Sequence, residues 1–155
     1  MRISRIQIDE GSLASPSDQV EHERKVAMFD LIEKNSFQPE GAKEAGCEGP
    51  FDLRLALEEN RLVFDISGTG FARKIMLSLA PFKAIMRDYA MICESYYDAL
   101  KNATPTQIES IDMGRRGIHN EGAELLCERL KGKIDIDHET ARRLFTLVNA
   151  LHLRA

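Results

Sequence analysis

The sequence lacks several features that define common classes of protein. Its 155 residues include no tryptophan, and aromatic residues make up only 6%. No apolar run is long enough to cross a bilayer, so we expect no membrane association. The net charge of -4 also lacks the basic excess with which general nucleic-acid binders displace counterions from phosphates. We therefore do not expect nucleic acid as a general partner.

Cysteine is scarce as well. Cys47, Cys93 and Cys127 are an odd number at wide spacings, which predicts reduced thiols and neither a disulfide framework nor a zinc ribbon. Cys93 falls on the apolar stripe of an expected helix, which favours a small buried side chain over a nucleophile. The first residues lack the continuous apolar stretch of a secretory signal, so we expect a cytoplasmic protein.

The motifs that usually announce a cofactor or metal are missing. The segment 68–70 lacks the third glycine and the following helix of a dinucleotide fingerprint, and no Gly-Lys-Ser/Thr phosphate loop occurs. Asp135, Asp137 and Glu139 alternate as at the start of an EF-hand. However, Thr140 and Thr146 occupy the positions where that loop needs glycine and a bidentate glutamate. We expect no cofactor and no metal.

Apolar alternation predicts a sheet in the first half of the chain, with strands over 3–8, 51–57, 62–66 and 74–79. A two-residue turn at Glu59-Asn60 would place every large residue of the hairpin on one face. The expected pairs are Leu57 with Leu62, Leu55 with Phe64, and Leu53 with Ile66. The last three strands should form an antiparallel meander with one apolar side.

Helical spacing dominates the remainder of the chain. Ser15 followed by Pro16 predicts a helix start, and Asn35 a helix end. A loop should occupy 36–50. Further helices are expected from Pro81, from the capping box at 104–107, over 121–131 and from Asp137, with a break near Gly114. The result is a single α+β domain over 1–155, in which several helices pack on the apolar face of a small antiparallel meander sheet.

Reactive side chains are most concentrated in residues 112–122. Arg115, Arg116 and Asn120 could bind a small anionic ligand at the start of the helix expected over 121–131, because guanidinium and helix-start N–H groups bind phosphate or carboxylate. His119 could transfer a proton and Glu121 could orient it, which makes these two the candidate catalytic residues. Alternatively, the segment is an interhelical turn in which Asn120 caps the following helix. Its arginines would then pair with nearby acids, namely Glu109, Asp112 or Glu124.

Five segments resemble a known family: 21–27, 77–82, 88–97, 111–122 and 140–147. Together they resemble the uncharacterised protein family 0262, found in alphaproteobacteria, and the match covers nearly the whole chain. The resemblance implies a bacterial cytosolic protein of one domain. It carries over no catalytic residue, because the family has no established activity, substrate or cofactor.

The function is therefore unknown, and whether the protein is an enzyme stays open. Our leading hypothesis is a non-catalytic binding or regulatory module that acts through a protein partner or as a homo-oligomer. Its basis is the last helix, whose apolar stripe is wider than one neighbour usually covers: Leu144, Phe145, Leu147, Val148 and Leu151. The alternative is an enzyme or sensor for a phosphorylated or carboxylated metabolite, built on Arg115, Arg116, His119 and Glu121. A third possibility is RNA contact through four arginines, at 115, 116, 142 and 143.

Overall fold

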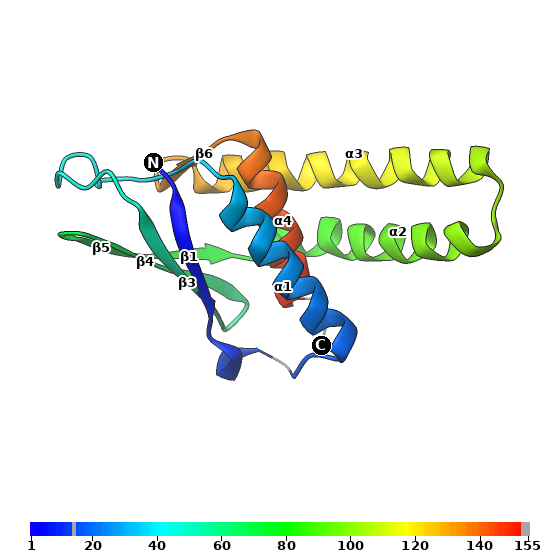
Figure 1. Cartoon of the computed structure of the whole chain (residues 1–155), viewed down its shortest axis with the longest axis horizontal. Helices are drawn as coiled ribbons and strands as arrows, with labels where there is room; N and C mark the ends of the chain where they lie inside the picture. The colour runs from blue at the N-terminus through cyan, green and yellow to red at the C-terminus, as the bar shows by residue number, and fades with distance from the viewer. Residues whose placement is uncertain (14, 153–155) are drawn as a thin grey trace.

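In the computed structural model, a β-sheet lies against helices on one of its faces and a long helical hairpin extends to one side (Figure 1). The structure describes residues 1–13 and 15–152. Of residue 152 it describes the backbone alone. Within this part, the helices are α1 (Asp18–Glu33), α2 (Lys83–Asn102), α3 (Pro105–Leu130) and α4 (His138–His152). The strands are β1 (Ile3–Ile8), β2 (Phe37–Pro39), β3 (Phe51–Glu58), β4 (Arg61–Gly68), β5 (Phe71–Ser78) and β6 (Ile134–Ile136). The α+β class is confirmed.

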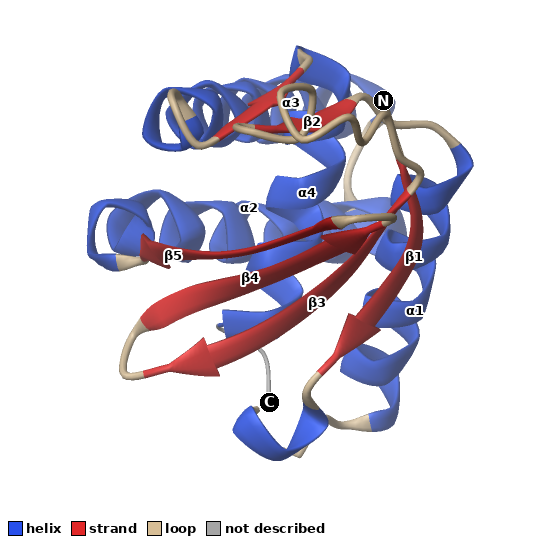
Figure 2. Ribbon diagram, turned by 90° about the vertical axis from the view of Figure 1, so that its left-hand side faces the viewer, coloured by secondary structure: helices blue, strands red, loops and turns tan. Residues whose placement is uncertain are grey.

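The main sheet has the strand order β1-β3-β4-β5. Strands β3, β4 and β5 form the expected antiparallel meander, whereas β1 pairs in parallel with β3, so the sheet as a whole is mixed. Parallel pairing needs a long crossover connection, and the segment between β1 and β3 supplies one that contains α1. Figure 2 shows the strands in front of the helices, which cover the opposite face of the sheet.

The register of the hairpin is confirmed at every predicted pair: Leu57 with Leu62, Leu55 with Phe64, and Leu53 with Ile66. Glu59 and Asn60 form the turn with φ values of 51° and 62°, the left-handed conformation that a tight two-residue hairpin turn requires. Strand β5 begins earlier than expected, because Gly68 pairs with Phe71 across a second tight turn. The large residues on the inner face of these strands, such as Leu55, Phe64 and Leu77, are buried.

The helix starts are partly as predicted. The capping box of α3 is confirmed, with Thr104 Oγ1 accepting from the Gln107 amide at 3.3 Å. Helix α1 begins two residues later than expected, since Ser17 rather than Ser15 caps it and accepts from the Val20 amide. Asn35 lies just beyond the end of α1, where its side chain accepts from the Ile3 amide at 2.7 Å and so ties β1 to that helix.

The expected break near Gly114 is wrong, because α3 is one continuous helix from Pro105 to Leu130. Two of its glycines lie at close contacts between helices. A Cβ atom at Gly114 would lie 2.9 Å from Ile92 of α2, and one at Gly122 would lie 2.5 Å from the Phe145 ring of α4. Glycine at these positions lets α3 approach its neighbours and does not end the helix.

Part of the predicted loop over 36–50 is a strand. Phe37–Pro39 forms β2, which pairs antiparallel with β6 in a second small sheet. The buried residues Phe37 and Pro39 alternate with the exposed Gln38, a pattern too short to stand out from the sequence. The partner strand lies about a hundred residues further along the chain, so only the tertiary structure brings the two together.

Helix α4 is the central helix of the fold, and α1 and α3 both pack against it. Nearly its whole circumference is buried, including Ala141, Leu144, Phe145, Leu147, Val148, Ala150 and Leu151. The stripe on this helix is therefore wide because several elements of the same chain cover it. The described apolar side chains of this stripe are buried within the chain, which removes the basis on which self-association was predicted.

Candidate functional site

The residues singled out from the sequence lie inside α3, which changes what they can do. Residues 112–122 are in the middle of a continuous helix, where backbone N–H groups are bonded to carbonyls one turn earlier. No helix start is present at this segment to bind an anion, and Asn120 caps no helix. Whatever this segment binds, it must bind through side chains.

Both arginines pair with the same acid. Arg115 Nε lies 3.1 Å and Arg116 Nη2 lies 2.7 Å from the carboxylate oxygens of Asp112. The Arg115 guanidinium also lies over the Tyr96 ring, 4.8 Å from its centre, in a cation–π contact. These hydrogen bonds lower the pKa of Asp112. Asp112 is one of the three acids that the alternative interpretation named, although the pairing occurs within a helix instead of a turn.

His119 is half-buried and held by two partners. Its Nε2 atom lies 2.8 Å from the Arg142 carbonyl oxygen and 2.9 Å from Thr146 Oγ1. Because a carbonyl only accepts, the proton of the neutral ring belongs on Nε2. The ring stacks on Tyr89, with centres 5.3 Å apart, and burial lowers the pKa of His119. His119 is thus a neutral side chain fixed between α2 and α4.

The remaining predicted residues do not join His119. Asn120 Oδ1 accepts from Arg142 Nη1 at 2.6 Å, which engages its acceptor oxygen within the fold. Glu121 is exposed, and two helical positions place it about 200° around α3 from His119. Glu121 therefore cannot orient the imidazole. The structure does not bring Arg115, Arg116, His119 and Glu121 to a common cleft.

A surface pocket of about 330 Å³ lies between α1 and α2, with α4 as its floor. We call it the α1–α2 pocket. Its volume is at the lower end of the range of about 300–1,000 Å³ that small-molecule sites occupy. The residues that line it include Val26, Asp30, Tyr89, Tyr97, Thr146 and Asn149. A smaller pocket of about 230 Å³, bordered by His119, shares Asp30 and Thr146 with it.

Tyr89 is a buried polar group of the α1–α2 pocket, with only 7% of its surface exposed. Burial raises the pKa of Tyr89 to about 12, and the neighbouring Cys93 adds to the rise, while Arg115 and Thr146 oppose it. The phenol is therefore protonated at neutral pH. It can donate a hydrogen bond, but it cannot serve as a base.

Asn149 is the most informative residue of the α1–α2 pocket. It is 4% exposed, and its Nδ2 donates to the Met86 carbonyl oxygen at 3.0 Å. Among the described residues, nothing donates to its Oδ1. A buried acceptor without a donor costs about 1–3 kcal/mol, so such groups mark positions where a ligand or water completes the bonding. The sequence contained a signal for it, namely one amide within the apolar run 147–151.

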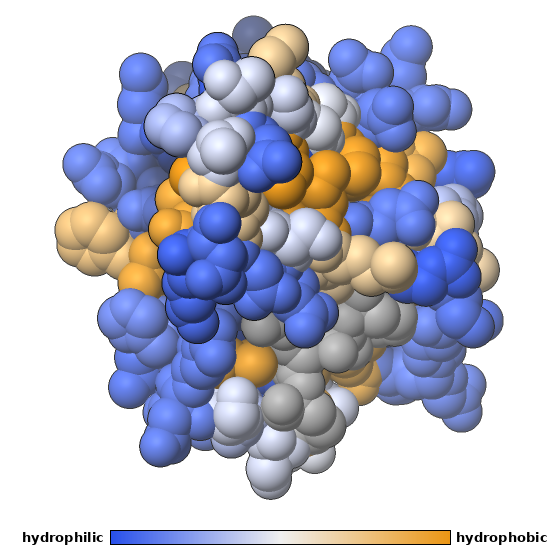
Figure 3. Space-filling view, turned by 90° about the vertical axis from the view of Figure 1, so that its right-hand side faces the viewer, coloured by the Kyte–Doolittle hydropathy of each residue, from blue (hydrophilic) through white to orange (hydrophobic). Residues whose placement is uncertain are grey.

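Exposed apolar side chains lie at the rim of the α1–α2 pocket, beside the exposed His22 and Asp30. Val26 is 44% and Tyr97 is 52% exposed, and Phe29, one turn after Val26 on α1, is 67% exposed. The hairpin of α2 and α3 exposes further apolar side chains, Leu100 and Met113 among them. Figure 3 views the molecule from the end of this hairpin, and apolar surface crosses the middle of that face between polar side chains.

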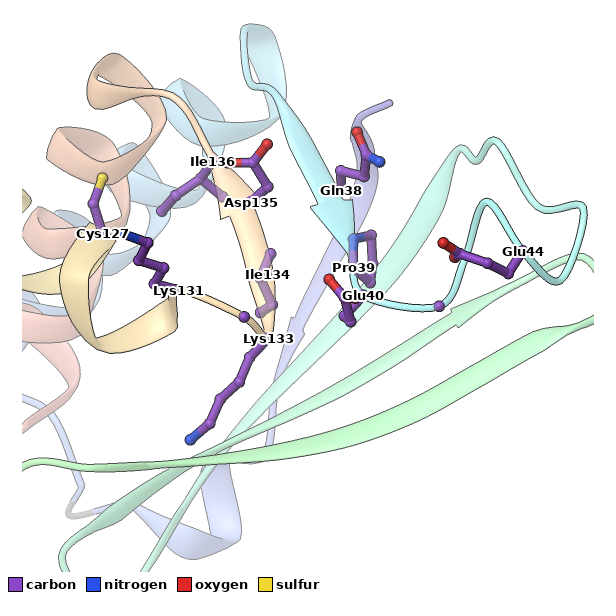
Figure 4. Close-up of a pocket in the computed structure, with 12 residues that line it drawn as sticks. Gln38, Pro39, Glu40, Glu44, Cys127, Lys131, Lys133, Ile134, Asp135 and Ile136 are labelled. Atoms are coloured by element: carbon purple, nitrogen blue, oxygen red, sulfur yellow. The ribbon is translucent and has the colours of Figure 1, made fainter.

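A second pocket, of about 480 Å³, lies beside β2 and β6 (Figure 4). We call it the β2–β6 pocket. Its charged side chains have both signs: Lys131 lies at one end and Glu44 comes from the loop after β2 at the other. Cys127 also lines it, and burial, followed by Asp137 and Asp135, raises the pKa of this thiol, which makes it a poor nucleophile. Among the described residues, no group of three or more His, Cys, Asp or Glu could hold a metal ion.

Comparison with known proteins agrees with the resemblance inferred from the sequence. The model of the family described as "Uncharacterised protein family (UPF0262)" matches residues 1–154. This chain belongs to that family. It is 58% identical over 153 residues to UPF0262 proteins of Phenylobacterium zucineum and Caulobacter vibrioides, covering 99% of this chain and 94% of each relative. It is 54% identical to the UPF0262 protein of Nitrobacter hamburgensis, covering 97% of this chain and 91% of that protein.

No solved structure matches this chain. The family description names no activity, substrate or partner, so the function must be argued from the geometry. In the described part of the chain, every helix is too short or too polar to cross a membrane.

Proposed function

We propose that this chain is a non-catalytic binding module and that its ligand site is the α1–α2 pocket. The observation that carries the proposal is Asn149, a buried amide whose Oδ1 accepts no hydrogen bond from the described residues and which lines a surface pocket. A pocket with mostly apolar walls and a few buried polar groups is the usual form of a small-molecule site.

The geometry favours binding over catalysis. The proton on His119 Nε2 is directed to the Arg142 carbonyl, and the Tyr89 phenol is protonated. Both arginines of the expected anion clamp are bonded to Asp112. An enzyme built on Arg115, Arg116, His119 and Glu121 would need these side chains around one substrate, but Glu121 lies about 200° around α3 from His119.

A protein partner is a second candidate, favoured by the exposed apolar side chains at the rim. The exposed Val26 and Tyr97 line the pocket, the exposed Phe29 follows Val26 by three residues on α1, and a further surface pocket of about 480 Å³ along α2 shares Tyr97. A partner or a second copy that covers this rim would enclose the ligand. Sedimentation of the wild type and of Phe29→Ser across the micromolar range tests self-association. If copies associate through this rim, the measured mass should rise with concentration for the wild type but not for Phe29→Ser.

The cytoplasm is the proposed compartment. No disulfide links Cys47, Cys93 and Cys127 in the described part of the chain, and reduced thiols are typical of cytosolic proteins.

A fragment screen followed by two-dimensional amide NMR tests the ligand site. We expect fragments to shift the amides of residues 22–30, 89–97 and 146–150, which surround the α1–α2 pocket. In Val26→Trp, an indole at the mouth of the pocket should abolish these shifts. Leu100→Trp is the matched control, because it places the same ring at an exposed position of α2 outside the pocket. Binding that is confined to other surfaces, or that survives in Val26→Trp, would contradict the proposal.

A further inference from the structure

The charged groups of the α1–α2 pocket are mainly acidic. Glu23 and Asp30 line it, and no lysine or arginine does so among the described residues. His22 is the only other ionisable side chain of α1 that borders it. Asp30 is exposed and has neither an ion-pair nor a hydrogen-bond partner in the described part of the chain. One carboxylate at the mouth of the pocket is therefore available to a cation.

Two arginines lie close to Asp30. Arg142 and Arg143 border the smaller pocket that Asp30 also lines. Arg142 donates to Asn120 Oδ1 at 2.6 Å, and Arg143 donates to the Lys34 carbonyl oxygen at 2.8 Å. Neither guanidinium group forms an ion pair with Asp30 among the described residues.

The base of the pocket also calls for a hydrogen-bond donor. Asn149 Oδ1 is a buried acceptor without a donor among the described residues. An ammonium group carries only donors, and it would satisfy this oxygen while remaining attracted to the carboxylate at the mouth. An ionised carboxylate carries only acceptors and would leave Asn149 unsatisfied.

Aromatic rings complete the surroundings that organic cations prefer. Tyr97 lines the pocket with its ring half-exposed, and Tyr89 lines it from deeper in the fold. Cations bind favourably over the faces of such rings, and Val26, Ala27 and Ala150 provide apolar wall for the rest of a ligand.

We propose that the ligand of the α1–α2 pocket is an organic amine, an ammonium group joined to a small apolar body. The inference rests on the proposed function and names the chemical class that the pocket selects. It is opposite in charge to the anionic ligand expected from the sequence, because the arginines behind that expectation bind Asp112 and the pocket nearby is acidic.

Three probes that share a phenylethyl group test the charge: 2-phenylethylamine, 2-phenylethanol and 3-phenylpropionate, titrated into the wild type and followed by amide NMR. We expect the amine to bind about tenfold more tightly than the carboxylate, with the alcohol between them. High salt should weaken binding of the amine and leave the alcohol unchanged. Equal affinity of the three probes in the pocket, or no binding by any of them, overturns this inference.

A matched pair of variants tests the carboxylate. Asp30→Asn should weaken amine binding about threefold without changing alcohol binding. Asp52→Asn, an exposed acid on the outer face of the main sheet, should change neither. An amine affinity that is the same in both variants overturns the role of Asp30. Equal binding of amine and alcohol in the pocket leaves the proposed function standing, whereas failure of every fragment to bind there removes the proposed function itself.

Discussion

The α1–α2 pocket and the β2–β6 pocket are both surface cavities, and they differ in what lies at their base. The β2–β6 pocket is the larger, at about 480 Å³ against about 330 Å³, but its charged side chains are mostly exposed and of both signs. The α1–α2 pocket reaches two buried polar groups, Tyr89 and Asn149. The comparison teaches that a buried group without a partner points to a binding site more strongly than volume does, because water satisfies exposed groups at little cost.

The largest expected effect lies where α4, the floor of the α1–α2 pocket, meets α3. Gly122→Val should lower the free energy of unfolding by about 3 kcal/mol, because a Cβ there would lie 2.5 Å from the Phe145 ring. Gly117→Ala is the control in the same helix. Nothing lies within 4 Å of its Cβ position, so we expect a gain of about 0.5–1 kcal/mol. Urea unfolding measures both, and a Gly122→Val protein as stable as the wild type would show that α4 can shift without loss.

A smaller effect on the free energy of unfolding should distinguish the two pockets. Asn149→Leu removes the unsatisfied acceptor, and the adjoining pocket has room for the larger side chain. We expect a free energy of unfolding about 1 kcal/mol higher, together with loss of the preference for the amine. Gln38→Leu, at an exposed position of the β2–β6 pocket, should change stability by less than about 0.5 kcal/mol. Marked destabilisation by Asn149→Leu would instead assign that amide a structural role.

The smallest expected effect is a dependence of the free energy of unfolding on pH, caused by His119 beside the α1–α2 pocket. The pKa of His119 is lowered in the folded protein, so the unfolded chain binds this proton first as the pH falls. Stability should therefore decrease as the pH falls through the ordinary imidazole value of about 6.5 and below it, until the folded form is protonated too. The lowered pKa values of Asp112 and Asp137 cause losses only in more acidic solution.

His119→Gln isolates this contribution, because glutamine keeps an N–H donor for the Arg142 carbonyl and does not titrate. Thermal unfolding between pH 7 and pH 5 should show a flatter profile for the variant than for the wild type. Identical slopes would mean that groups other than His119 cause the dependence.

The candidate site was only partly predictable. The sequence drew attention to 112–122 and offered Glu109, Asp112 or Glu124 as partners of its arginines, and in the structure both arginines bond Asp112. The interpretation of the segment as a turn is wrong because glycine usually signals the end of a helix. Here Gly114 and Gly122 lie inside α3, where they allow close contact with α2 and α4. Asn149 was missed because its significance depends on what surrounds it. An amide in an apolar stripe becomes informative only when its partners are known.

Local chemistry by itself determined much of this protein. The capping box at Thr104, the left-handed turn at Glu59-Asn60 and the strict alternation in β3 act between residues close in sequence, and each appears as predicted. Only the tertiary structure decided the parallel pairing of β1, the meeting of β2 with β6, the continuity of α3 and the pocket floored by α4. These features depend on contacts between distant segments, whose free energy exceeds the weak local preference of any single residue.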